Sequence, residues 1–190
     1  VIQNCWVYWE PDGDVTDLKA VLGSDAEGAG YQYQITGASA GGLVGYSKGN
    51  CTITGSLAAT LVNGAASAGG LIGTADSSPT AIKYSYADCY LIGGAKASVA
   101  GLIGQLNNGR NAALTNCYAA GYITGGNKAA GLCLGTGTTR AENAYSAMRS
   151  PGRELGNTFY FLTEMQAGDS FVNTRFLGKE SDQISGTLKS

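Results

Sequence analysis

The sequence predicts an all-β fold, a β-solenoid similar to a parallel β-helix, in which units of about 30 residues stack on one another. Three observations lead to this expectation. A Gly-Leu-hydrophobic-Gly motif recurs at nearly even spacing, short segments within each unit alternate in the manner of strands, and the chain holds 30 glycines against 3 prolines. So much glycine without a Gly-x-y period excludes collagen and indicates frequent tight turns.

The Gly-Leu-hydrophobic-Gly motif begins at Gly42, Gly70, Gly101 and Gly131, with starts 28, 31 and 30 residues apart. The fourth copy carries one extra residue, so that Leu134 takes the place of the final glycine. A single unit of this size cannot bury its apolar face alone, so neighbouring units are expected to stack. The leucines predicted to form one internal column are Leu43, Leu71, Leu102 and Leu132.

A second recurring element is a three-residue segment at the start of a predicted strand. Its copies are Asn4-Cys5-Trp6, Asn50-Cys51-Thr52, Tyr84-Ser85-Tyr86, Asn116-Cys117-Tyr118 and Asn143-Ala144-Tyr145. In the strand after Tyr84, alternation predicts an inward face of Ser85, Ala87, Cys89 and Leu91 and an outward face of Tyr86, Asp88 and Tyr90. In the second copy, the same alternation predicts an inward face of Cys51, Ile53, Gly55 and Leu57.

These motifs resemble the GLUG repeat family over residues 36–147. The segment 161–171, with Thr-Glu-Met at 163–165 and Ser-Phe at 170–171, is similar to the tail that follows such repeats. The family occurs in bacterial surface proteins and in some secreted IgA-cleaving metallopeptidases. The resemblance implies a bacterial protein located outside the cell or on its surface.

Three regions are expected along the chain: an N-terminal irregular rung or cap at 1–35, the repeat solenoid at 36–150, and a C-terminal cap or tail at 151–190. The caps would cover the open sheet edges that stacked strands leave at both ends. Residues 6–35 fit either an elaborated rung or a loop excursion. We expect the chain to be a fragment of a larger protein.

Composition narrows the range of functions. Charged residues make up 14% of the chain and no run of lysine or arginine occurs, which argues against a nucleic-acid partner. Histidine, the commonest general base, is absent. No apolar stretch approaches the roughly 18 residues that span a bilayer, so membrane insertion is not expected. The glycine-rich segments lack the Lys-Ser or Lys-Thr of a phosphate-binding loop, and no cofactor is predicted.

The five cysteines lack the Cys-x-x-Cys spacing of a metal site. Cys5, Cys51 and Cys117 occupy the same position in the recurring three-residue segment, which predicts buried free thiols and leaves only a Cys5–Cys51 disulfide open. The acids Glu10, Asp12, Asp14 and Asp17 surround a Pro-Asp-Gly turn, which fits a weak calcium site or a solvated turn. The solvated turn is preferred, and no metal is predicted.

The expected function is that of a non-catalytic structural or adhesive module, with a host glycan or host protein as partner. The candidate binding residues are two outward columns of tyrosines, with Tyr86, Tyr118 and Tyr145 in one and Tyr90 and Tyr122 in the other. The same rings could instead serve cross-strand packing. Two alternatives remain, an accessory segment of a secreted peptidase and a carbohydrate-active β-helix. The second needs paired carboxylates, whereas Asp88 and Glu142 are isolated in different units.

Overall fold

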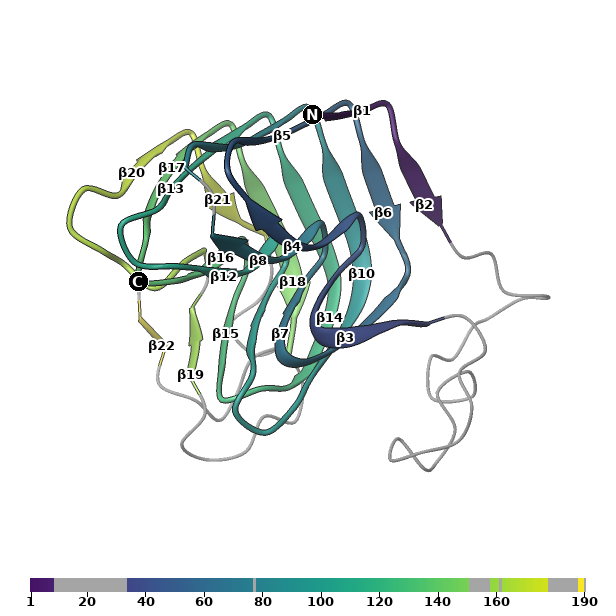
Figure 1. The fold of residues 1–190 in the computed structure, drawn as a ribbon. Coiled ribbons are helices and arrows are strands. Elements are labelled where there is room, and N and C mark those ends of the chain that lie inside the picture. Colours follow the sequence, from purple (N-terminus) through teal and green to yellow (C-terminus); the bar gives the residue numbers. More distant parts are fainter. Residues whose placement is uncertain (9–33, 77, 151–157, 161, 178–187, 190) are drawn as a thin grey trace.

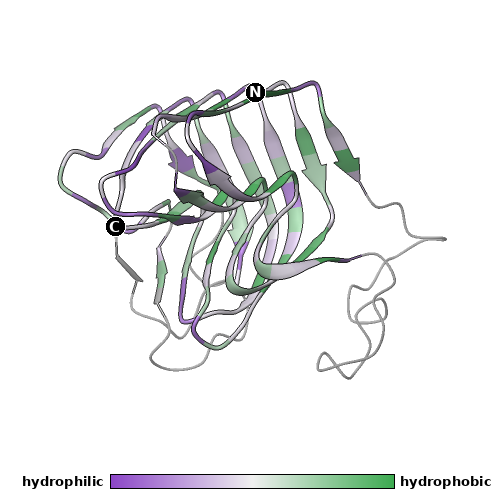
Figure 2. Cartoon of the chain, in the orientation of Figure 1, coloured by the Kyte–Doolittle hydropathy of each residue, from purple (hydrophilic) through white to green (hydrophobic). Residues whose placement is uncertain are grey.

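The computed structural model describes residues 1–8, 34–76, 78–150, 158–160, 162–177 and 188–189, and these residues form parallel strands and no helix. The strands wind into a β-solenoid of about four turns (Figure 1). The predicted fold class is therefore confirmed. Apolar stretches recur on neighbouring strands, as Figure 2 shows, and the buried side chains of successive coils form one continuous core.

Each coil runs through three parallel sheets. Sheet A is formed by β1 (Ile2–Gln3), β5 (Cys51–Thr54), β9 (Thr80–Lys83), β13 (Asn111–Thr115), β17 (Thr138–Glu142) and β20 (Ser170–Val172). Sheet C is formed by β4 (Val44–Lys48), β8 (Ile72–Asp76), β12 (Ile103–Leu106) and β16 (Cys133–Gly135).

Sheet B is larger and bends, because each coil contributes to it twice. Its first row is β2 (Trp6–Tyr8), β6 (Leu57–Ala59), β10 (Tyr86–Gly93), β14 (Tyr118–Gly125), β18 (Tyr145–Arg149) and β21 (Arg175–Phe176). Its second row is β3 (Gln34–Gly41), β7 (Leu61–Gly69), β11 (Ser98–Ala100), β15 (Lys128–Ala130), β19 (Thr158–Tyr160) and β22 (Leu188–Lys189). The two rows are joined where β10 pairs with both β6 and β7.

The corner between sheets A and B places one residue per coil in the left-handed region, with φ between 47° and 58°. These residues are Asn4, Gly55, Tyr84, Asn116, Asn143 and Asn173. Asparagine and glycine tolerate this conformation best, which explains why most copies carry one of them. The corner also fixes the register of each strand that follows it.

Gly55, and not Asn50, is the corner residue of its coil, so the predicted register of the second copy is wrong. Cys51 begins β5 and pairs with Thr80. The corner at Gly55 interrupts the alternation, so Ser56 and Ala58 are buried while Leu57 is only half-buried. The predicted inward face was confirmed for Ile53, and in the next coil for Ser85, Ala87, Cys89 and Leu91.

The residue after the corner has a small polar side chain in every described coil but one, where it is Ala144, and in several coils this side chain holds the corner. The Ser56 and Ser85 hydroxyls donate to the carbonyls of Thr54 and Lys83 at 2.9 and 2.7 Å. The Cys117 thiol takes the same place and donates to the Thr115 carbonyl at 3.3 Å. The Ser85 hydroxyl also accepts the Ser56 backbone N–H at 3.1 Å, which ties adjacent coils together. Cysteine in this column therefore acts as a substitute for serine.

The Gly-Leu-hydrophobic-Gly motif is explained by packing on both sides of the chain. A Cβ on its first glycine would collide with an alanine Cβ across the core, in the pairs Gly42–Ala58, Gly70–Ala87 and Gly101–Ala119. The leucine column is confirmed: Leu71, Leu102 and Leu132 are fully buried, and Leu43 at the end is half-buried. The column continues to Leu162, whose carbonyl accepts the Leu132 N–H at 2.7 Å.

The last glycine of the motif lets sheet C approach the second row of sheet B backbone to backbone. A Cβ on Gly73 would lie 2.7 Å from the Ala40 nitrogen and oxygen, and one on Gly104 would lie 2.5 Å from the Ala68 oxygen. In the fourth copy Leu134 replaces this glycine, and the pairing of β12 with β16 shifts register there. Leu134 packs in a second cluster with Ala100, Ala130 and Tyr160.

The ends of the chain contribute rungs to the same sheets. The region 151–190 supplies β19, β20, β21 and β22, each paired in parallel with the preceding coil. At the other end Tyr8 pairs with Ala59 and Gln34 with Leu61. In the next coil Thr60 alone separates the partners of Tyr8 and Gln34. The described parts of 1–35 are rungs.

Candidate functional site

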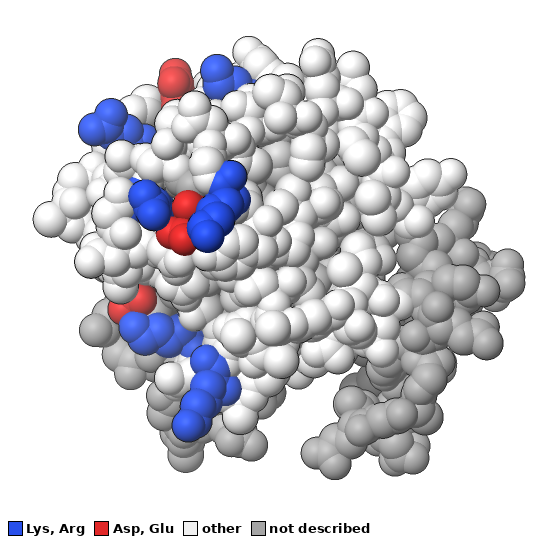
Figure 3. All heavy atoms as spheres, viewed as in Figure 1, with Lys and Arg blue, Asp and Glu red and all other residues white. Residues whose placement is uncertain are grey.

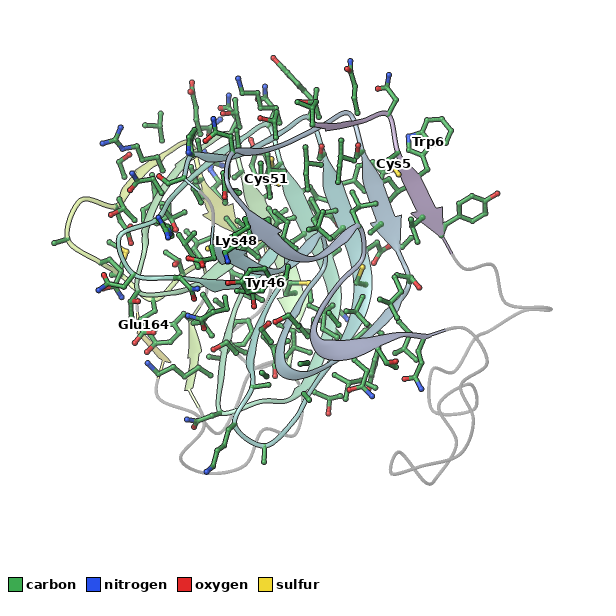
Figure 4. The ribbon with its side chains drawn as sticks, in the orientation of Figure 1. Cys5, Trp6, Tyr46, Lys48, Cys51 and Glu164 are labelled. Atoms are coloured by element: carbon green, nitrogen blue, oxygen red, sulfur yellow. The ribbon has the colours of Figure 1, made fainter. Side chains whose placement is uncertain are left out.

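The first row of sheet B carries one outward column along the solenoid axis, here called the aromatic column. By strand register it consists of Trp6, Leu57, Tyr86, Tyr118, Tyr145 and Arg175. Neighbouring strands lie about 4.8 Å apart, so the rings of Tyr86, Tyr118 and Tyr145 follow one another at roughly that spacing, while Leu57 separates Trp6 from Tyr86. Trp6 begins the column and points away from the solenoid, as Figure 4 shows.

Exposure differs along the columns. Trp6, Tyr86 and Tyr118 are 69%, 45% and 37% exposed, whereas Tyr145 is half-buried. Tyr90 and Tyr122 are also half-buried and are register partners, with ring centroids 6.1 Å apart and planes tilted by 34°. The structure thus brings together both sets of predicted tyrosines. The first set offers rings to solvent, while the second contains a packed pair.

A shallow, open groove of about 370 Å³ lies at the edge of the aromatic column. Its lining residues are Tyr84, Ser85, Tyr86, Asn116 and Tyr118, all of them uncharged. Tyr84 is 64% exposed and occupies the left-handed corner with a φ of 50°. Sequence reasoning did not assign Tyr84, Asn116 or Trp6 to a site. The sequence did offer one signal for Tyr84: it is the only aromatic residue at the first position of the recurring three-residue segment, where the other copies have asparagine.

The corner asparagines form a ladder that leads to this groove. The Asn173 Nδ2 donates to the Asn143 Oδ1 at 2.7 Å, and the Asn143 Nδ2 donates to the Asn116 Oδ1 at 3.1 Å. The next corner holds Tyr84, which has no amide, so the ladder ends at Asn116.

The described carboxylates with the strongest contacts serve to join coils. Asp76 accepts hydrogen bonds from Arg110 Nε and from the Tyr46 hydroxyl, both at 2.9 Å. Arg110, Tyr46 and Asn107 together lower the pKa of Asp76, and Asp76 in turn raises the pKa of Tyr46. Figure 3 shows acidic side chains between basic ones in a cluster on an otherwise mostly uncharged view.

A second carboxylate contact joins the coil that contains Leu132 to the one that contains Leu162. Glu164 accepts from Lys128 Nζ at 2.6 Å and from the Tyr160 hydroxyl at 3.0 Å. Burial, together with the Glu164 carboxylate, raises the pKa of Tyr160 to about 12. Both clusters stabilise contacts between coils and lie apart from the aromatic column.

All five cysteines are free thiols. Cys89, Cys117 and Cys133 are buried, and burial raises their pKa to about 12, 11 and 12. Figure 4 shows Cys5 and Cys51 well separated. Cys5 directly follows the Asn4 corner, where its backbone N–H donates to the Ser56 hydroxyl, whereas Cys51 begins β5 in sheet A. The disulfide left open by the sequence is therefore not formed in this structure.

In the part of the chain that the structure describes, no three cysteine or carboxylate side chains lie close enough together to hold a metal ion. The acidic turn from Glu10 to Asp17, weighed above as a calcium site, lies outside the described residues. Within the described ranges there is no helix that is long and apolar enough to cross a membrane.

Comparison with known proteins gave no match: no family model, no curated protein and no solved structure is significantly similar to this chain. The resemblance to GLUG repeats therefore rests on the sequence motifs and stays a prediction. The fold and the groove have to support any functional conclusion by themselves.

Proposed function

We propose that this chain is a non-catalytic adhesive module of a bacterial surface or secreted protein, and that its aromatic column binds neutral glycans. The observation that carries the proposal is the run of exposed rings along the first row of sheet B, beside a groove lined only by uncharged residues. The GLUG-like motifs support the location outside the cell.

Ring stacking gives the physical reason for a glycan. A pyranose ring has C–H groups on its faces and hydroxyl groups around its rim, so its face packs on a tyrosine or tryptophan ring. These aromatic side chains combine large apolar area with few rotatable bonds. A rigid parallel sheet already orders the rings, which reduces the entropy lost on binding.

A non-catalytic role is supported by the residues available. The chain contains no histidine, and glycosidic cleavage needs two carboxyl groups about 5 to 10 Å apart. Asp76 and Glu164 are each engaged in an ion pair between coils, and Asp88 on β10 and Glu142 on β17 belong to different sheets.

Free cysteines are unusual in oxidising compartments, where most secreted proteins pair them. Here burial offers an explanation consistent with the proposal. The thiolate is the reactive form, and the raised pKa of Cys89, Cys117 and Cys133 keeps these three protonated at neutral pH. Oxidation of the three is further hindered because their side chains are inaccessible to solvent.

The proposal is tested by titrating the purified chain with neutral oligosaccharides in isothermal calorimetry. The double variant Tyr86→Ser with Tyr118→Ser removes two exposed rings of the column and should weaken binding at least about tenfold, since each ring stacks on the ligand. Tyr46→Ser is the matched control, because Tyr46 is 51% exposed and lies on sheet C.

The control should bind as the unaltered chain does, and the double variant should keep its melting temperature within a few degrees. Undiminished binding by the double variant would remove the aromatic column as the binding site. Absence of binding to every oligosaccharide would reject the proposal altogether.

A further inference from the structure

We propose that the groove beside Tyr84 is the primary subsite for one neutral pyranose ring, and that the Asn116 side-chain amide donates the hydrogen bond that orients it. The inference rests on the proposed function and assigns a specificity-determining residue within it. Two features carry it: the direction of the asparagine ladder and the residue that interrupts it.

The ladder leaves a donor at its end. Asn173 donates to Asn143 and Asn143 donates to Asn116, so each bond runs toward the groove. The Asn116 Oδ1 is thereby used as an acceptor, while no described residue accepts from its Nδ2. Hydrogen bonds in a chain polarise one another, which makes the terminal N–H a better donor than an isolated amide.

Tyr84 is the feature that keeps this donor available. An asparagine at the Tyr84 corner would continue the ladder and accept from Asn116, just as Asn116 accepts from Asn143 and Asn143 from Asn173. An aromatic residue at a φ of 50° is an unfavourable choice for this left-handed conformation. The strained residue instead supplies an exposed ring to the groove wall, together with Tyr86 and Tyr118.

The chemistry of the groove fits a sugar ring. Three aromatic walls suit the C–H faces of a pyranose, and one amide donor at the rim suits a hydroxyl or ring oxygen. The lining carries no charge, which favours a neutral sugar over an acidic one. An extended peptide would gain most from an unpaired strand edge, whereas the groove lies on a sheet face between paired strands β10 and β14.

Two variants test the inference, by their affinity for hexasaccharides of glucose, mannose and N-acetylglucosamine. Asn116→Asp keeps an acceptor for Asn143 and tolerates a positive φ, yet it loses the donor. We expect its Kd for the bound hexasaccharide to rise about tenfold. Tyr84→Asn should abolish binding while raising the melting temperature, because it relieves strain and completes the ladder.

Asn4→Asp is the matched control, since it makes the same substitution at a corner with a φ of 53° that takes no part in the ladder. It should bind within about twofold of the unaltered chain. Isotope-edited NMR adds a direct readout, because the Asn116 side-chain amide resonance should shift when the hexasaccharide binds.

The outcomes separate the two proposals. If the Tyr86 and Tyr118 double variant loses binding while Asn116→Asp and Tyr84→Asn bind normally, the groove inference fails and the aromatic column stands. If no hexasaccharide binds the unaltered chain, both fail. A proline-rich peptide that shifts the Asn116 amide where no sugar does would overturn the choice of ligand.

Discussion

One residue per coil at the corner between sheets A and B decides what that corner can do. The amide ladder is formed by Asn116, Asn143 and Asn173, while glycine relieves the backbone at Gly55 and Tyr84 lines a groove. All six share nearly the same backbone conformation, so the differences come from side chains alone. The backbone corner and the proposed binding groove thus depend on the same set of positions.

Cys117, which directly follows the Asn116 corner, should make the stability of the fold depend on pH. Burial raises the pKa of Cys117 from 9.0 to about 11, so the folded state holds this proton more tightly than the unfolded state. The resulting stability is complete below about pH 9 and is lost as the pH rises toward about 11. Cys117→Ser should lose less stability over this range, by a margin on the order of 1 to 3 kcal/mol.

Urea unfolding at pH 8 and pH 10.5 measures that margin for both proteins. Serine is a suitable replacement because Ser56 and Ser85 already occupy the column with equivalent hydrogen bonds. Equal losses of unfolding free energy in the two proteins would show that this thiol does not titrate differently on folding.

Residue-level expectations succeeded where side-chain alternation was continuous. Tyr86, Tyr118 and Tyr145 could be aligned because each follows a corner at the same distance. Cys51 was misplaced because Asn50-Cys51-Thr52 matches the letters of other copies, whereas the corner depends on backbone conformation at Gly55. The groove could not be predicted, since it depends on the left-handed backbone at the Tyr84 and Asn116 corners and on how the side chains lie there.

At the last glycine of the motif, the backbones of sheet C and of the second row of sheet B pack so closely that a side chain should not fit. Gly73→Ala places a Cβ within 2.7 Å of the Ala40 backbone, which cannot move without shifting β3. We expect a loss of roughly 2 to 4 kcal/mol of unfolding free energy. Gly49→Ala is the comparison, because Gly49 has a φ of 80° but open space around it.

The Gly49→Ala change should cost only the conformational strain, roughly 1 to 2 kcal/mol. Chemical denaturation of both variants separates the effects. A Gly73→Ala loss no larger than that of Gly49→Ala would mean that the two strands adjust freely and that the glycine is not required for packing.

The motif itself was visible in the sequence, and its leucine column was predicted because apolar residues at one period must share a face. Close packing at its two glycines was also expected, but the partners they pack against were not, because each lies in another sheet. The extra residue of the fourth copy is accommodated by a register shift that allows Leu134 to bury itself against Tyr160.

For the whole molecule, burial decreases toward both ends. Leu43 and Ile2 at one end, and Leu162, Phe171 and Phe176 at the other, are only partly buried, while core residues between them are inaccessible. Stability in a repeat protein is a sum over units and their interfaces, so end coils should open more often. Hydrogen exchange measured by mass spectrometry should show slowest exchange in β10 and β14.

Exchange in β2 and β21 should be faster by an order of magnitude or more, as each lies in an end rung of the described sheet. Uniform protection from β2 to β21 would contradict a graded solenoid and indicate one fully cooperative unit. The region 151–190 was expected to be a cap because 161–171 is similar to the tail that follows such repeats, and within it Leu162 and Asn173 occupy the leucine and corner columns.

The replacement of Thr60 by residues 9–33 in the preceding coil has a consequence for how such a molecule can be diversified. Pairing stops at Tyr8 and resumes in register at Gln34, so a sequence of considerable length enters one coil without disturbing its neighbour. The position between Ala59 and Leu61 is therefore a natural acceptor for grafted sequences. Through such a position, evolution or an engineer can add new segments to the solenoid while its ladder of hydrogen bonds is kept.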